Sequence, residues 1–294
     1  MELTETAPTR TARRRWGAVR VWNVAVIAGM VGLYCVVVGV GIWSQGRPVL
    51  SLGYWMEGGG GTAKKMAWVA PRMRDVPLGT LGDSVRRGEV IFNETPLYAA
   101  EFTHSRIACA SCHAEGGIQP FASAVVGVPV MFPQFNERAG HVITLKDRIQ
   151  ECFVRSENGK PLPYDGREMR ALVNYIEWLS EPEPGHEPFV GRGLVALPEL
   201  KPDVGRGEGI YATQCAGCHG ANGEGKRPMF PPVWGPDSFN DGAGMNGVRK
   251  MASFVQHNMP QNRMGILSAQ DAFDVAGFIH EQPRPIFNVA YKKY

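Results

Sequence analysis

The residues best suited to chemistry in this 294-residue chain form two copies of the motif C-x-x-C-H, which read CASCH at 109–113 and CAGCH at 215–219. This motif is the attachment signature of c-type haem. Its two thiols reach the two vinyl groups of one porphyrin, and its histidine supplies an imidazole to the iron. The predicted attachment residues are Cys109, Cys112, Cys215 and Cys218, and the predicted iron ligands are His113 and His219.

Disulfide bonds and zinc ribbons are the alternatives for such closely spaced cysteines. A zinc ribbon places two C-x-x-C pairs around one metal ion and gives no reason for a histidine after each pair. Both motifs also lie in repeated surroundings, because RGEVIF at 87–92 precedes the first and RGEGIY at 206–211 precedes the second. We therefore predict two covalently bound haem c groups, each holding one iron.

Each iron then needs a ligand on its other side. We call the part of the chain around the first motif the first module and the part around the second motif the second module. In the second module Met259 lies 40 residues after His219, within HNMPQN. A methionine at about this distance is the usual second ligand of a class I cytochrome c, and it raises the haem potential. Methionine is more often a core residue than a ligand, so other methionines stay open as alternatives. They are Met229, Met245, Met251 and Met264.

The first module has no Met-Pro pair at the corresponding distance, and Cys152 lies there instead, 39 residues after His113. The haem motifs use their own cysteines, and Cys35 lies in a predicted membrane span, so Cys152 has no partner thiol. Two interpretations stay open. Cys152 is an iron ligand, or it is a buried small hydrophobe and Met131 or Met169 binds the first haem instead.

The segment LKDRIQECFVRS at 145–156 is predicted to form a helix with Thr144 as its N-cap. Arg148, Cys152 and Ser156 are spaced by four residues and therefore share one face of that helix. A thiolate beside fixed cations forms an anion site that contains a sulfur nucleophile. Further cations are Arg138 and Lys160, and a solvated helix face with Asp147 and Glu151 as partners is the alternative.

Several longer segments resemble the diheme thiosulfate dehydrogenases. In the first module they are RIQECFVRSENGKPLP at 148–163 and EMRALVNYIEWLS at 168–180. In the second module they are FPPVWGPDSFNDGAGM at 230–245 and the HNMP that follows. The resemblance covers roughly residues 80–287, which is nearly all of the predicted soluble part of the chain.

The resemblance implies an activity: that family joins two thiosulfates oxidatively into tetrathionate and releases two electrons. Its haem ligands correspond here to His113 and Cys152 at the catalytic haem, and to His219 and Met259 at the haem that passes electrons on. Its substrate-binding residues correspond to Arg138, Arg148 and Ser156. Some members have a lysine before the distal methionine as an alternative ligand. This chain has Asn258 there, which puts such a ligand exchange in doubt.

An apolar run at 22–43 predicts a transmembrane helix, because 22 helical residues reach about 33 Å and no charge interrupts them. Four arginines at 13–20 precede it and Arg47 follows it alone, so the N-terminus is expected in the cytoplasm. A cleaved signal peptide is the alternative. The run is too long for a typical signal peptide, and no A-x-A cleavage site follows it.

The predicted fold is mainly α, with two class I cytochrome c-like domains in tandem after a single N-terminal transmembrane helix. Gly-rich residues 57–65 predict a tether, and Pro/Gly-rich residues 181–193 predict a linker. The predicted division is a cytoplasmic N-terminus (1–21), an anchor (22–43), a tether (44–74), cytochrome domain 1 (75–182), a linker (183–202), cytochrome domain 2 (203–287) and a C-terminal tail (288–294).

The predicted function is thus that of a diheme cytochrome c in the inner membrane, with periplasmic haem domains that oxidise thiosulfate to tetrathionate. Its electrons would pass to a cytochrome c, a copper protein or a terminal oxidase. A net charge of +3 gives no argument for nucleic acid binding. The alternatives are a non-enzymatic electron-transfer cytochrome, or cytochrome c subunit of a respiratory membrane complex, and a sulfur-carrier cytochrome with a persulfide on Cys152.

Overall fold

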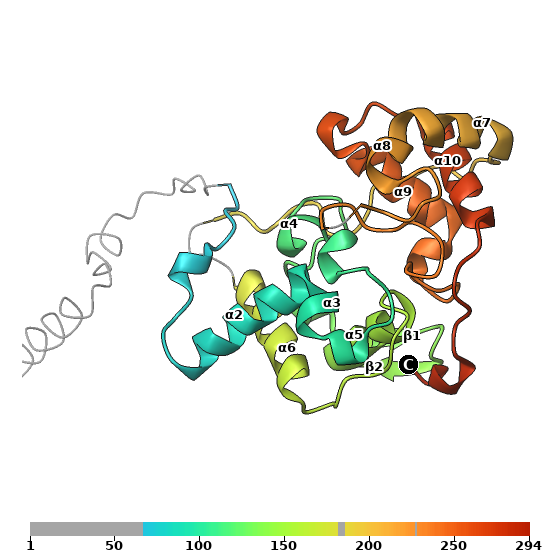
Figure 1. Cartoon of the computed structure of the whole chain (residues 1–294). Helices are drawn as coiled ribbons and strands as arrows, with labels where there is room; N and C mark the ends of the chain where they lie inside the picture. Colours follow the sequence, from blue (N-terminus) through green and yellow to red (C-terminus); the bar gives the residue numbers. More distant parts are fainter. Residues whose placement is uncertain (1–66, 182–185, 227) are drawn as a thin grey trace, which may run out of the picture. The chain divides into compact units, whose positions relative to one another are not determined.

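The computed structural model describes residues 67–181, 186–226 and 228–294 (Figure 1). The predicted cytoplasmic N-terminus and membrane anchor lie outside the described residues, as does most of the predicted tether. Within those three ranges no helix has the length and apolar character needed to cross a bilayer.

Helices supply most of the regular structure of both modules, which confirms the predicted mainly α fold. The helices of the first module are α2 Thr80–Asn93, α3 Thr95–Tyr98, α4 Ala114–Gly117, α5 Leu145–Arg155 and α6 Arg167–Ser180. Those of the second are α7 Val204–Ile210, α8 Ala216–His219, α9 Val248–Asn258 and α10 Ala269–Glu281. In the described part of the chain, the strands are β1 Gln134–Asn136 and β2 His141–Ile143, which pair antiparallel.

The repeated Arg-Gly-Glu sequence lies where the opening helix of each module packs against its closing helix. A Cβ on Gly88 of α2 would lie 2.0 Å from the carbonyl oxygen of Ala171 on α6. A Cβ on Gly207 of α7 would lie equally close, 2.0 Å, to the carbonyl oxygen of Asp274 on α10. Because only glycine lacks a Cβ, the repeat preserves a close helix contact in both modules.

The arginine of the same repeat pairs with an acid on the closing helix. In the first module Arg87 donates to Glu168 of α6 at 2.6 Å. In the second module Arg206 donates to Asp274 of α10 at 2.6 Å. The weak sequence repeat therefore has one physical basis, which is a glycine contact flanked by an ion pair.

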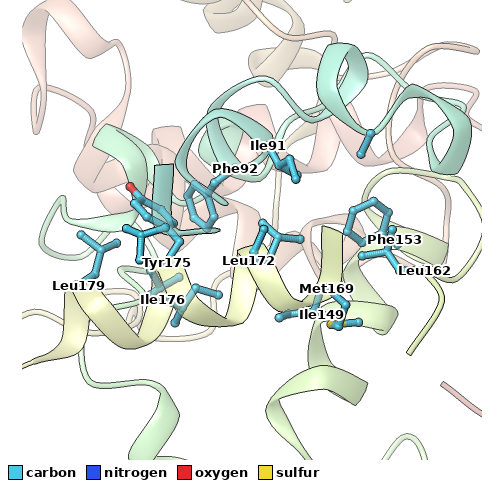
Figure 2. Packing of buried hydrophobic residues seen from close by; sticks show 14 of the residues in the cluster. Ile91, Phe92, Ile149, Phe153, Leu162, Met169, Leu172, Tyr175, Ile176 and Leu179 are labelled. Carbon is cyan, nitrogen blue, oxygen red and sulfur yellow. The ribbon is translucent and has the colours of Figure 1, made fainter. Parts of the chain in front are cut away.

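The core of the first module is built on α6 (Figure 2). The side chains at 172, 175, 176 and 179 share its buried face, as the helical spacing predicts. Residues from α2, α5 and the following loop pack against them. The labelled side chains are Ile91, Phe92, Ile149, Phe153, Leu162, Met169, Leu172, Tyr175, Ile176 and Leu179.

Helix α5 is held at both ends. At its start Thr144 Oγ1 accepts from Asp147 N at 3.2 Å, and Asp147 Oδ2 accepts from Thr144 N at 2.8 Å, which confirms the predicted cap. At its end Asn240 of the second module donates its backbone N–H to Arg155 O at 3.1 Å and its side-chain amide to Val154 O at 2.9 Å. The second module thus satisfies carbonyl groups that the end of the helix leaves free.

Candidate active site

A cavity of about 300 Å³ in the first module brings the predicted site residues together. Among its lining residues are Cys109, Cys112, His113, Arg148, Cys152 and Ser156. The last three come from α5 and its C-cap, where their spacing by four turns them to one side. The helix face predicted from the sequence therefore borders the haem motif.

The two motif histidines have the same hydrogen-bond arrangement. His113 Nδ1 lies 2.5 Å from the carbonyl oxygen of Ser123, and His219 Nδ1 lies 2.8 Å from that of Pro231. A carbonyl only accepts, so each Nδ1 carries the proton and each Nε2 keeps a free lone pair for a metal. Burial lowers the pKa of both imidazoles, which favours the neutral form that binds iron.

Cys152 is a free thiol, and so are the four motif cysteines. Burial raises the pKa of Cys152, whereas the positive charges of Arg148 and Arg138 oppose that rise. A metal ion deprotonates a thiol that coordinates it. The surroundings of Cys152 therefore suit a neutral thiol in the absence of metal and a thiolate in its presence.

Arg148 is oriented by a buried acid on its own helix. Its Nη1 donates to Glu151 Oε2 at 2.6 Å, and the Glu151 side chain is 3% exposed. Asn136 Nδ2 donates to the same oxygen at 3.1 Å, so the carboxylate is itself fixed. The alternative to an anion site was a solvated helix face with Asp147 and Glu151 as partners, and Glu151 is indeed a partner of Arg148. Asp147 caps the helix instead.

Arg138 and Lys250 extend the positive charge towards the second module. Arg138 does not line the cavity, and its Nη1 donates to the carbonyl oxygen of Gly242 at 3.3 Å. Burial lowers the pKa of Lys250, and the nearby charges of Arg148 and Arg138 lower it further. Lys250 lies on α9, about 100 residues after Arg148 in sequence, so no local pattern could have identified it.

The structure does not bring all of the predicted neighbours into the cavity. Lys160 pairs with Glu101 at 3.2 Å and lies over the ring of Phe102, outside the lining. Met169 is fully buried in the core and does not line the cavity, whereas Met131 does. Of the two methionine alternatives for the first haem, Met131 is therefore the one with access to it.

Glu157 is a site residue that the sequence analysis missed. Its side chain is 1% exposed and lines the cavity, and burial raises its pKa well above the usual range. Cys109 Sγ lies 3.9 Å from its Oε1. The residue occurs in the polar segment SENGK after α5, which reads as an exposed loop, so its burial carries no sequence signal.

A larger cavity of about 1100 Å³ surrounds the second haem motif. Its lining includes Cys215, Cys218, His219 and Met259, and also Met229, Met245 and Met251. Met264 is absent from that lining. Met259 directly follows the last residue of α9, and it packs partly buried against the core of this module.

The residues of both modules fit a covalently attached haem. Each cavity is lined mainly by apolar side chains and contains the two free thiols of its own motif beside an imidazole whose Nε2 is free. Volumes of about 300 and 1100 Å³ fall close to the ~300–1,000 Å³ range of cofactor sites. Attached haems would convert the four motif thiols to thioethers.

Two protein families match the two modules separately. Residues 95–184 match the family described as "SoxA/TsdA, cytochrome c domain". Residues 202–279 match "Cytochrome C oxidase, cbb3-type, subunit III". Both descriptions concern c-type cytochromes, so the two modules are cytochrome c domains and carry covalently bound haem c.

Relatives that match about three quarters of the chain are thiosulfate dehydrogenases. The chain is 40% identical to that of Allochromatium vinosum, over 76% of this chain and 86% of the relative. It is 36% identical to that of Stutzerimonas stutzeri, over 73% of this chain and 72% of the relative.

A solved structure supports the same relation. The thiosulfate dehydrogenase TsdBA from Marichromatium purpuratum matches with a TM-score of 0.70 and 35% identity, over 74% of this chain and 50% of that one. The chain thus spans half the length of that protein. With these similarities along both haem modules, the chain is an oxidoreductase that belongs to the thiosulfate dehydrogenase family.

Proposed function

We propose that this chain oxidises thiosulfate and joins two thiosulfates into one tetrathionate. The observation that carries the proposal is the position of Cys152, whose thiol lines the same cavity as the CASCH motif, Arg148 and Ser156. An electron-transfer cytochrome needs no thiol beside an arginine at its haem. The names of the relatives support thiosulfate as the substrate.

The charges of the site suit the substrate. Thiosulfate is a small dianion, so holding two of them requires cations. The guanidinium of Arg148 forms forked hydrogen bonds that match sulfonate oxygens, and Glu151 holds it in place. Ser156 offers a hydroxyl donor, while Arg138 and Lys250 add positive charge at the edge.

The proposed reaction proceeds through a covalent adduct on Cys152. Its thiolate forms a bond to the terminal sulfur of one thiosulfate, and two electrons leave, so the adduct is a sulfonate linked through a disulfide bond, Cys152 Sγ–S–SO3⁻. The terminal sulfur of a second thiosulfate then attacks the middle sulfur of the adduct, which came from the terminal position of the first thiosulfate. This step releases tetrathionate and restores the Cys152 thiolate. A haem c attached at Cys109 and Cys112 would supply the one-electron acceptor that this oxidation needs.

The proposed ligands divide the two haem sites by role. His113 and Cys152 would hold the iron of the first haem, and His219 and Met259 that of the second. Methionine ligation raises a haem potential, so electrons would move from the first haem to the second.

The test is the variant Cys152→Ala in the full chain with both haems attached. Thiosulfate turnover with an artificial acceptor should fall by orders of magnitude, because a covalent pathway is removed. Haem content should stay at two per chain, since attachment uses other cysteines. The low-spin thiolate signal of one haem in electron paramagnetic resonance should vanish. Near-normal turnover in this variant would refute the proposal.

The runner-up is a membrane-tethered electron carrier, or a subunit of a respiratory complex. The match of residues 202–279 to a subunit of an oxidase favours it. Under that alternative thiosulfate would not reduce the haems of the purified protein. Under our proposal it reduces them, and tetrathionate accumulates, which also separates the enzyme from a sulfur carrier that retains a persulfide.

We further propose that residues 22–43 anchor the chain in the inner membrane, with the haem modules in the periplasm. The support is the uninterrupted apolar run and the arginines before it. The acceptor would be a cytochrome c, a copper protein or a terminal oxidase. The full chain should resist alkaline extraction from membranes, whereas a chain that starts at residue 62 should be soluble and keep both haems.

A further inference from the structure

Asn258, the last residue of α9, is buried at the junction of the two modules. Asn258 is 2% exposed. In sequence it directly precedes Met259, the proposed ligand of the second haem. Its Oδ1 accepts from Gln119 Nε2 of the first module at 2.8 Å. Its Nδ2 donates to Phe121 O at 3.1 Å and to Phe254 O at 3.0 Å. Both amide hydrogens and the carbonyl are therefore used.

The partner segment, residues 119–123, is itself tightly fixed. Gln119 is 9% exposed. Phe121 and Ser123 have φ angles of 59° and 54°, in the left-handed region that costs energy for residues other than glycine. The backbone N–H groups of the same two residues donate to Gly191 O at 2.6 Å and Gly193 O at 2.9 Å. Such a costly conformation persists only where the surroundings enforce it.

Segment 119–123 also reaches the first haem site. The carbonyl of Ser123 accepts from His113 Nδ1 at 2.5 Å and so orients the proximal imidazole. Two residues earlier, the carbonyl of Phe121 accepts from Asn258. One short segment is thus hydrogen-bonded to the proposed proximal ligand of one haem and to the neighbour of the proposed distal ligand of the other.

We propose that Gln119 and Asn258 are positioning residues that couple the two haem sites. This inference rests on the iron-ligand roles proposed above for His113 and Met259. Asn258 holds the end of α9 so that Met259 is presented to its cavity, and segment 119–123 transmits strain or displacement between the two ligands. Coupling of this kind is reciprocal: a change at either site alters the equilibrium at the other.

The variants Asn258→Ala and Gln119→Leu test the coupling, with Asn222→Ala as the control. Asn222 is exposed and belongs to the second module. Gln119→Leu keeps a side chain of similar size and removes the donor to Asn258, and it adds no thioether to the cavity that Gln119 lines. In both test variants, the fraction of oxidised protein without the sulfur-to-iron charge-transfer band should rise roughly tenfold to hundredfold, because buried groups lose their partners.

The second measurement is a spectroelectrochemical titration of each haem without thiosulfate. In both test variants the oxidised-to-reduced ratio of the first haem at fixed potential should change by about fivefold, although neither substitution touches its ligands. In the control, neither the band nor either haem should change. Haem content and circular dichroism identify any variant that fails to fold, in which case the other variant decides.

The coupling is refuted if Gln119→Leu or Asn258→Ala alters the second haem alone, because that result would show local packing only. It is also refuted if both match the control. Loss of turnover in Cys152→Ala is measured separately. Failure of the coupling therefore leaves the proposed thiosulfate reaction intact, and failure of that reaction leaves the spectroscopic result interpretable.

Discussion

Asn240→Ala should destabilise the protein, because Asn240 joins the second module to the helix that carries Cys152. The Asn240 side chain is 1% exposed. Its Nδ2 donates to Val154 O at 2.9 Å and to Asn158 Oδ1 at 3.1 Å. Its Oδ1 accepts from Gly242 N at 3.1 Å. Alanine removes all three hydrogen bonds and keeps the backbone contact with Arg155.

The magnitude follows from those contacts. A typical hydrogen bond contributes about 1 kcal/mol net, and a buried group left without a partner costs about 1–3 kcal/mol. We therefore expect the free energy of unfolding to fall by about 3 kcal/mol. For a domain of about 150–250 residues, that loss corresponds to a decrease of about 6–12 °C in Tm.

Denaturant unfolding of the haem-loaded protein, followed by far-ultraviolet circular dichroism, measures the change. Asn222→Ala is the matched control, because it makes the same chemical change at an exposed position of the same module. It should alter stability by less than about 0.5 kcal/mol. If Asn240→Ala is as stable as that control, the second module does not cap α5 as described.

Three further predictions follow from the site. Arg148→Lys should raise the KM for thiosulfate roughly tenfold, because lysine keeps the positive charge but lacks the forked hydrogen bonds of a guanidinium. The thiolate signal of the first haem should persist in this variant. Met259→Ala should abolish the sulfur-to-iron band and lower the potential of one haem only; a surviving band would identify another methionine as ligand. Glu157→Gln should remove a pH-dependent loss of stability. Burial raises the pKa of Glu157, so folded protein retains a proton that the unfolded chain releases above its ordinary pKa of 4.5. The wild-type Tm should therefore fall relative to the variant as pH rises from about 5 to 8, and parallel curves would contradict this.

Local patterns were sufficient to predict the haem motifs and the elements around them. The C-x-x-C-H motif needs two thiols that are one helical turn apart, so haem attachment can be predicted from the sequence without tertiary structure. The cap of α5 and the shared face of Arg148, Cys152 and Ser156 follow from helical spacing within twelve residues. The glycine of the Arg-Gly-Glu repeat was visible in the sequence, but the structure gave its reason, a helix contact that admits no Cβ.

Tertiary structure alone decided which distant groups meet at the site. Glu157 lies in a polar segment, and only packing against the haem motif buries it. Lys250 and Asn240 approach α5 from the second module, about 85 to 100 residues away in sequence. The bond from Gln119 to Asn258 spans 139 residues. Helical periodicity describes neighbours within a few turns, whereas these contacts depend on how the modules dock, which no local spacing specifies.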